Sequence, residues 1–211
     1  MPEPNSRKVE DRLREEYFDR LPEFRRAVEE LEVRVRYLTL PVLHKLRPHE
    51  KLVIRSRVKE FASVLAKLQR KVKGAREGRI LPPDIVPSVL TLRDIVGVRV
   101  LAFPDERVLE IDQLLRPYFP NWVSDPIPYE GGLKYAPKYV GYCETASREV
   151  MCEYQIVPML VGLFWDVEHA AMYKHDLVAK SKGMLKRRAK VESALAEFEK
   201  GVVDLLPSRD G

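Results

Sequence analysis

The sequence is poor in cysteine: Cys143 and Cys152 are the only two among 211 residues. Their number and spacing indicate neither a disulfide framework nor a zinc site, so we expect free thiols. If the two cysteines lie on the paired strands of a hairpin, their side chains could face each other. No apolar run approaches the roughly 20 residues of a membrane span. Residues 1–6 lack the basic region and apolar segment of a signal peptide. We therefore expect a soluble, cytoplasmic protein without membrane association.

Internal repeats and low-complexity tracts are also lacking, and the composition is that of a globular chain, with 45% hydrophobic and 33% charged residues. The length allows one sizeable core. A net charge of +5 fits a phosphate-rich ligand or a nucleic acid, although many ordinary proteins share this balance. The pattern predicts one domain with helical arms: an N-terminal helical region at 1–48, a core at 49–176, and a C-terminal helix and tail at 177–211.

Hydrophobic periodicity predicts an α/β fold, because stretches of period two alternate with stripes at three- and four-residue spacing. Pro22 fits a first helical turn, which tolerates proline, and the glycine- and proline-rich 71–87 is expected to be a mobile loop. Helices are expected within 5–46, from 59 onward, and at 104–118, 160–173 and 180–206, and strands at 52–58, 92–103, 122–128, 138–144 and 150–157.

Four donor groups cluster where the predicted strand 52–58 gives way to a helix. Arg57 and Lys59 lie at the turn, while Ser63 and Lys67 lie on successive turns of one helix face. Such a group can converge on one anion. The alternative interpretation is an ordinary solvated basic helix face.

Two predicted strands carry polar side chains that are costly to bury. Asp94 precedes the β-branched run of strand 92–103, and Arg99 lies within it. Glu153 and Gln155, two residues apart, share one face of strand 150–157. A strand-entry aspartate and a surface arginine are the simpler explanation for the first pair. His169 lies on an apolar helix stripe, where a satisfied core histidine is more common than a ligand.

Taken in order, these motifs resemble the synthetase domain of the RelA/SpoT-type alarmone synthetases, especially the single-domain small alarmone synthetases. The resemblance covers about residues 50–175 and joins four motifs in the family's order. They are Arg57-x-Lys59-x3-Ser63-x3-Lys67, Asp94-Ile95-Val96-Gly97-Val98-Arg99, Glu153-Tyr154-Gln155-Ile156, and Trp165-Asp166-Val167-Glu168-His169 with Tyr173-Lys174.

The resemblance implies an α/β (α+β) fold with a mixed or antiparallel sheet of about five strands flanked by helices, related to nucleotidyltransferases. It implies transfer of pyrophosphate from ATP to a 3′-hydroxyl, with release of AMP. Asp94 and Glu153 would share Mg²⁺, and Glu153 would also activate the hydroxyl. Gln155 and His169 match positions near the acceptor and in its supporting shell. The residues implied for ATP are Arg57, Lys59, Ser63, Lys67 and Arg99.

The family's acceptor loop, Gly-Tyr-Arg-Ser-x-His, is only partly retained. It aligns with Gly132-Leu133-Lys134-Tyr135-Ala136-Pro137, which lacks the guanine-stacking tyrosine and the histidine. A register at Gly141-Tyr142 leaves too few residues before Glu153 and is disfavoured. Lys134 and Tyr135 remain as acceptor-binding candidates, because stacking tolerates different bases.

Val157 replaces an arginine of the family. Leu163 and Phe164 lie at positions where the family often has a polar residue that contacts guanosine. The donor-binding residues are thus complete, while the guanosine-reading residues are largely lost.

These losses favour a pyrophosphokinase whose acceptor is the tRNA 3′ CCA end, in the manner of toxic small alarmone synthetases that are countered by an antitoxin. Basic clusters at 25–26, 70–79 and 186–188 would then contact tRNA phosphates, although solubility alone also explains them. The alternatives are a (p)ppGpp synthetase of the stringent response using GTP or GDP, a (p)ppApp synthetase, and an inactive RNA-binding or regulatory module. The terminal helices are candidates for a homo-oligomer or antitoxin interface.

Overall fold

The computed structural model describes residues 4–76, 87–145, 148–173 and 182–206. Its helices are α1 (Pro4–Leu43), α2 (Phe61–Arg76), α3 (Glu106–Leu115), α4 (Met159–Tyr173) and α5 (Lys182–Asp204), with 3-10 turns η1 (Val89–Thr91) and η2 (Arg116–Tyr118). Its strands are β1 (Lys51–Val58), β2 (Val96–Phe103), β3 (Val123–Ser124), β4 (Ile127–Pro128), β5 (Tyr135–Ala136), β6 (Lys138–Glu144) and β7 (Glu149–Pro158).

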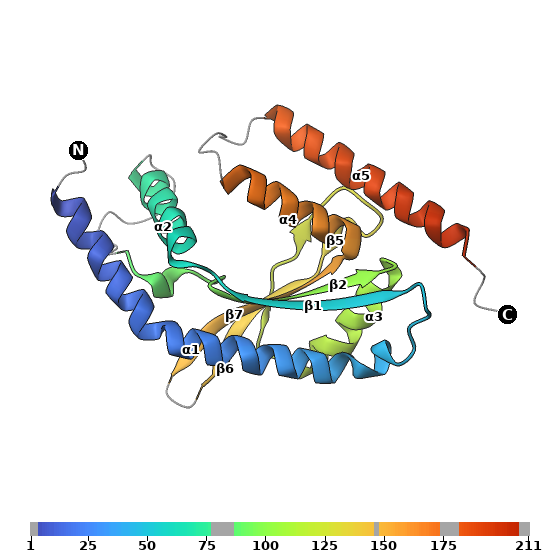
Figure 1. Cartoon of the computed structure of the whole chain (residues 1–211), viewed down its shortest axis with the longest axis horizontal. Helices are drawn as coiled ribbons and strands as arrows, with labels where there is room; N and C mark the ends of the chain where they lie inside the picture. The colour runs from blue at the N-terminus through green and yellow to red at the C-terminus, as the bar shows by residue number, and fades with distance from the viewer. Residues whose placement is uncertain (1–3, 77–86, 146–147, 174–181, 207–211) are drawn as a thin grey trace. The chain divides into compact units, whose positions relative to one another are not determined.

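Five of the strands form one sheet in the order β1-β2-β7-β6-β3, and β4 pairs antiparallel with β5 (Figure 1). This confirms the predicted α/β fold with a sheet of about five strands and flanking helices. None of the described helices is long and apolar enough to cross a membrane.

The chain divides into two compact units, which are described separately. Unit 1 comprises 1–33, 56–98 and 140–153, and unit 2 comprises 34–55, 99–139 and 154–211.

The core of unit 1 forms where α1 meets the turn between β1 and α2. Tyr17 of α1 is buried, its ring lies 5.5 Å from that of Phe61, and its hydroxyl donates to the Lys59 carbonyl at 2.9 Å. Glu16 accepts a hydrogen bond from the backbone N–H of Val89 at 3.1 Å. These contacts fix the segments on either side of the candidate site.

Helix α1 is continuous, so the prediction of several helices within 5–46 is wrong. Pro22 lies in the helix interior, not in a first turn. An interior proline loses one backbone hydrogen bond and costs about 3 kcal/mol. The buried stripe around it, which includes Phe24 and Leu31, offsets this cost through apolar burial.

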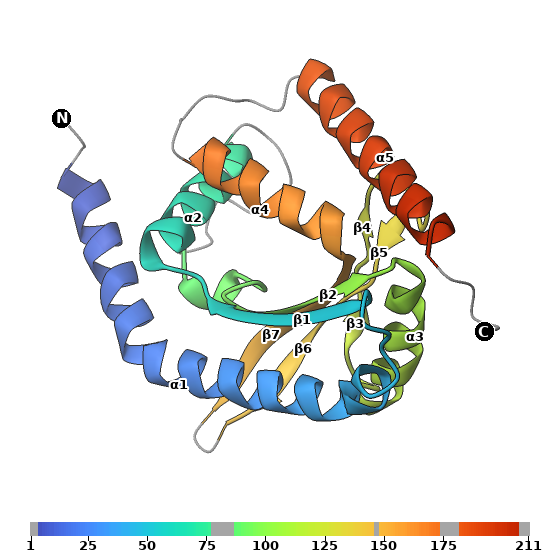
Figure 2. The same cartoon turned by 45° about the vertical axis from the view of Figure 1, so that its right-hand side comes forward.

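The core of unit 2 is built around α4. Trp165 is buried against Leu101, Tyr129 and Val161. Helices α4 and α5 lie side by side in two views (Figures 1 and 2). This arrangement brings α5 against the segment between β4 and β5, since the position of an added Cβ on Gly131 lies 3.4 Å from the Ala196 side chain.

Other boundaries differ from the predictions. Helix α2 continues through Gly74 to Arg76, so 71–76 is not loop, and the rest of that loop prediction, 77–86, lies outside the described residues. The expected strand 92–103 starts only at Val96, because η1 precedes it. The expected strand 122–128 is split into β3 and β4 by Pro126, which cannot donate a ladder hydrogen bond.

Candidate active site

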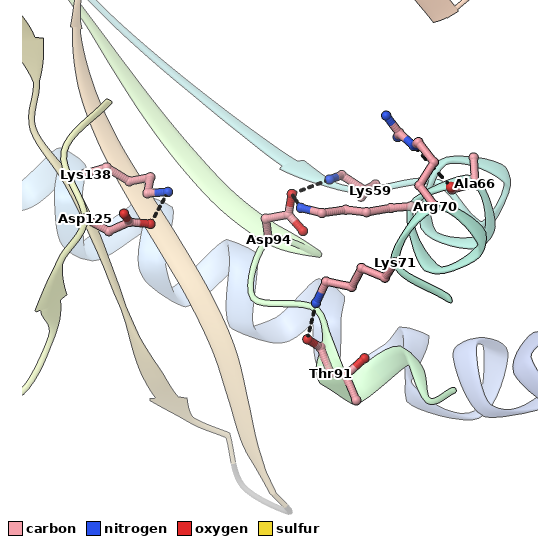
Figure 3. A network of polar contacts seen from close by, with 9 residues as sticks. Lys59, Ala66, Arg70, Lys71, Thr91, Asp94, Asp125 and Lys138 are labelled. Carbon is pink, nitrogen blue, oxygen red and sulfur yellow. Dashed lines mark hydrogen bonds and ion pairs between the residues drawn. The ribbon is translucent and has the colours of Figure 1, made fainter. Parts of the chain in front are cut away.

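Three predicted donor-side residues meet in unit 1. The Nζ atoms of Lys59 and Lys67 each lie 2.5 Å from Oδ2 of Asp94. Figure 3 shows Lys59 pointing at the Asp94 carboxylate from the turn before α2. The other carboxylate oxygen, Oδ1, is buried and accepts no hydrogen bond from any described residue. One aspartate therefore binds two ammonium groups through one oxygen and keeps the other, buried oxygen for a further ligand.

The local sequence explains this convergence. Lys59 directly follows β1, and its backbone N–H donates to the Ile95 carbonyl at 2.7 Å, which ties the turn to the start of β2. Lys67 lies two helical turns further along α2. Asp94 precedes β2, so its side chain lies beside both lysines.

The lysines set the charge state of Asp94. Burial alone would raise the pKa of Asp94, but hydrogen bonds and charge attraction from Lys59 and Lys67 outweigh it and lower the pKa. Lys71 is a neighbour that the sequence did not single out. Burial lowers its pKa, and the positive charge of Lys67 lowers it further. Its ammonium group donates to the Thr91 carbonyl at 3.1 Å (Figure 3).

Two more of the residues predicted to bind ATP lie on the same elements as Lys59 and Lys67, whereas Arg99 belongs to unit 2. Arg57 is exposed on β1, where exposed and half-buried residues alternate. Ser63 is half-buried on α2, one turn before Lys67. Unit 1 thus places Arg57, Lys59, Ser63 and Lys67 on one strand, one turn and one helix.

Glu153 of β7 is also in unit 1 and is only 7% exposed. Its side chain lies over Gly97 of β2: an added Cβ on Gly97 would lie 3.3 Å from the Glu153 Cγ and 3.4 Å from Oε1. Glycine at position 97 therefore makes room for the Glu153 carboxylate. This role was missed, since the sequence motif alone presents Gly97 as a strand residue.

One carboxylate oxygen of unit 1 is of the kind that magnesium prefers. The described residues contain no cluster of three or more metal-ligating side chains. Mg²⁺ is usually held by one or two carboxylates together with substrate phosphates, so such a cluster is not required. The buried Oδ1 of Asp94 is a hard oxygen ligand of the right kind.

Arg99 lies in unit 2, where polar side chains hold it. Its Nε donates to Oε1 of Gln155 at 3.1 Å, and its Nη1 lies 2.6 Å from Oδ1 of Asp166. The second Asp166 oxygen accepts from Arg55 at 2.9 Å. Sequence reasoning assigned no role to Asp166 or Arg55, because neither had a predicted partner. Their spacing along the chain gave no signal for this network.

The acceptor-side candidates also lie in unit 2. Lys134 has a positive φ of 64° and is exposed, and Tyr135 of β5 is 50% exposed. Leu133 packs against the buried cluster around Trp165. His169 is exposed on α4, which rules out the simpler alternative of a core histidine.

No protein-family model and no curated protein sequence matches this chain. Solved structures do match it. The small alarmone synthetase 1 from Bacillus subtilis bound to its product pppGpp has a TM-score of 0.66 and 21% identity, over 90% of this chain and 96% of that one. The same protein bound to AMPCPP gives 0.57 and 22%, over 90% and 97%.

A GTP pyrophosphokinase family protein from Streptococcus pneumoniae gives a TM-score of 0.58 and 22% identity, over 90% of this chain and 93% of that one. At such identities the likeness establishes the fold. It agrees with the resemblance that the ordered motifs indicated. This chain has the fold of the small alarmone synthetases.

Proposed function

We propose that this protein transfers pyrophosphate from ATP to the 3′-hydroxyl of a nucleotide acceptor, and that the acceptor is the 3′ CCA end of tRNA. The observation that carries the proposal is the Asp94 cluster of unit 1: a carboxylate held by two lysines through one oxygen, with its other oxygen buried beside them. Phosphoryl-group transfer depends mainly on positioning and charge neutralisation, and this cluster supplies both kinds of charge.

On the donor side, Arg57, Lys59, Ser63 and Lys67 bind the ATP phosphates, and Arg99 adds a guanidinium. Asp94 and Glu153 hold Mg²⁺, which when bound neutralises charge on the phosphates. Structures of this fold are known with AMPCPP, an ATP analogue, and with pppGpp, which supports a nucleotide site here.

In the reaction, the acceptor 3′-oxygen attacks the β-phosphorus of ATP. A new P–O bond forms, the bond from the β-phosphorus to the bridging oxygen of the α-phosphate breaks, and AMP leaves with that electron pair. Glu153 takes the proton of the hydroxyl. Its carboxylate is shielded from solvent beside Gly97, which suits a group that takes a proton from a bound acceptor.

The acceptor part of the proposal is supported by Leu133 and Tyr135. Leu133 stands where the family's loop carries its guanine-stacking tyrosine, and it packs into the core. Tyr135 instead presents an exposed ring. Stacking on a ring contributes about 1 to 3 kcal/mol per base and does not select guanine, which suits an RNA end better than free GTP.

The test uses purified protein with Mg²⁺ and ATP labelled on the γ-phosphate, and separately deacylated tRNA, GTP, GDP or no acceptor. We expect label on tRNA together with an equal amount of AMP, since AMP distinguishes pyrophosphate transfer from simple phosphorylation. Transfer RNA whose terminal ribose is oxidised by periodate is the matched control and is expected to remain unlabelled.

Label on GTP or GDP would make the chain a (p)ppGpp synthetase, the second candidate, which the pppGpp-bound relative favours. Transfer to ATP would make it a (p)ppApp synthetase. Either result would overturn the tRNA proposal. Absence of AMP with all acceptors would overturn the enzymatic function and leave an inactive binding module, against which the shielded carboxylates Asp94 and Glu153 argue.

Gly97→Ala is expected to reduce the transfer rate about tenfold or more, with a stability cost of about 1 kcal/mol. The added methyl group lies 3.3 Å from Glu153 Cγ, so the carboxylate has to move. Steady-state rates and chemical denaturation measure the two effects. Gly201→Ala is the matched control, because its Cβ meets nothing within 4 Å. A wild-type rate for Gly97→Ala would contradict the role of Glu153.

A further inference from the structure

Asp166 of α4 joins two arginines that lie far from it in the sequence. Its Oδ1 accepts from Nη1 of Arg99 at 2.6 Å, and its Oδ2 accepts from Nη1 of Arg55 at 2.9 Å. Gln155 completes the group, because its Oε1 accepts from Nε of Arg99 at 3.1 Å. All four residues belong to unit 2. We call them the Asp166 cluster, and the function proposed above gives a role in ATP binding only to Arg99.

The fold brings these side chains together from three neighbouring strands and one helix. Arg55, Arg99 and Gln155 lie on β1, β2 and β7, which follow one another in the sheet, and α4 carries Asp166. Side chains of adjacent strands that bind a common partner emerge from the same face of the sheet. The sheet therefore holds both arginines at their base, while the α4 carboxylate holds their guanidinium groups. Groups placed on strands and helices in this way are more precisely oriented than groups on loops.

Arg99 is held at two different nitrogens of its guanidinium group. Gln155 accepts the hydrogen of Nε, and Asp166 accepts a hydrogen of Nη1. Because the N–H groups of a guanidinium form a rigid planar fork, two such bonds fix the plane of the group as well as its position. The Arg99 side chain is only 18% exposed. A long side chain that is ordered before a ligand arrives loses less conformational entropy when the ligand binds.

Stability and charge do not account for Asp166. The side chains of Asp166 and Arg55 are 39% and 51% exposed, and ion pairs at such exposure stabilise a fold only weakly. The charge of Asp166 does not help an anion to bind either, since a carboxylate beside two guanidinium groups lowers the local positive potential. What Asp166 supplies is a fixed direction for the Arg99 side chain.

We propose that Asp166 is a positioning residue for nucleotide binding: it holds the Arg99 guanidinium in the orientation that receives ATP. Arg55 in turn holds Asp166 in place through the second carboxylate oxygen. This inference rests on the proposed function, in which Arg99 binds ATP. In this role Asp166 acts through Arg99 and does not contact the nucleotide. Its effect is therefore expected on the affinity for the nucleotide and not on the chemical step.

The sign of one substitution separates positioning from charge. Asp166→Asn removes a carboxylate beside two guanidinium groups, so electrostatic attraction alone predicts tighter binding of an anionic nucleotide. Positioning predicts the opposite. We expect the dissociation constant of AMPCPP, measured by isothermal titration calorimetry with Mg²⁺, and the KM for ATP to rise about tenfold, with kcat within about threefold of wild type. Asp204→Asn, at the exposed last residue of α5, is the matched control and is expected to bind AMPCPP like wild type.

A double-mutant cycle then tests whether Asp166 acts through Arg99. In an Arg99→Met background, Asp166→Asn is expected to change the AMPCPP affinity by less than about twofold, because the group that Asp166 positions is gone. Circular dichroism checks that each variant is folded. Tighter or unchanged AMPCPP binding by Asp166→Asn, a fall in kcat with KM unchanged, or additive effects of the two substitutions would each overturn the positioning role and leave the proposed function intact.

The wild type separates failure of the inference from failure of the proposed function. A wild type that binds AMPCPP but releases no AMP with any acceptor would overturn the transfer reaction, while the affinity comparison would still decide the role of Asp166. A wild type that does not bind AMPCPP would overturn the proposed function, and the inference with it.

Discussion

Asp94→Asn is expected to reduce pyrophosphate transfer by about a thousandfold or more while the chain stays folded. Asparagine keeps the size and shape of the side chain but has no charge. It neither neutralises the ammonium groups of Lys59 and Lys67, which lie 2.5 Å from the native oxygen, nor offers an anionic oxygen for Mg²⁺. Initial rates of AMP release, with circular dichroism as a check on folding, measure the effect.

The same variant has a predicted stability signature. Because the pKa of Asp94 is lowered in the folded state, its ion pairs stabilise the fold above the ordinary aspartate pKa, and this contribution disappears as pH falls through the lowered value. The stability gap between wild type and Asp94→Asn is therefore expected at pH 7 and should narrow as pH falls below the ordinary aspartate pKa. Asp19→Asn is the matched control, since its side chain is 74% exposed. A rate for Asp94→Asn within tenfold of wild type would contradict the proposed site.

Glu199→Gln is expected to stabilise the protein at pH 8 by about 3 kcal/mol relative to wild type. Burial raises the pKa of Glu199 from 4.5 to about 7, and the negative charge of Asp105 contributes to this rise. Its Oε1 is buried and accepts no hydrogen bond from any described residue. Above pH 7 the folded state must carry this charge in a buried position, whereas glutamine remains neutral.

The sign follows from proton uptake. Between about pH 4.5 and pH 7 the folded protein binds more protons at Glu199 than the unfolded chain does, so the contribution of Glu199 to stability is highest at low pH and falls as pH rises. Urea denaturation at pH 5 and pH 8 measures this, and the gain from Glu199→Gln should be much smaller at pH 5. Glu29→Gln, at an exposed position of α1, is the control. An equal effect at both pH values would show that Glu199 does not carry the proton.

The donor side of the candidate site was largely predictable because its geometry is local. A strand that ends at Val58 and a helix that begins at Phe61 place Lys59 and Lys67 from short-range periodicity alone. The sequence predicted that these donors converge on one anion. In the structure, two of them converge on Asp94, a carboxylate of the chain itself.

Other parts depend on contacts between segments far apart in the sequence. Asp166 pairs with Arg55, 111 residues away, and with Arg99, 67 residues away. No periodicity signals such a network. The unbroken course of α1 through Pro22 likewise depends on tertiary packing that outweighs the local preference of proline.

The double ion pair of Asp94 has a consequence for the order in which ligands bind. Under the proposed function, free ATP would draw the two lysines away and leave a buried carboxylate without a counterion, while a free cation at Asp94 would leave the two ammonium groups uncompensated. Each of these partial exchanges is costly in a poorly hydrated setting. The preformed magnesium–nucleotide complex would replace both partners at once, with its cation at Asp94 and its phosphates at the two lysines, so that no charge is left without a counterion. Under the proposed function, the resting ion pairs would therefore favour the complex over its separate components.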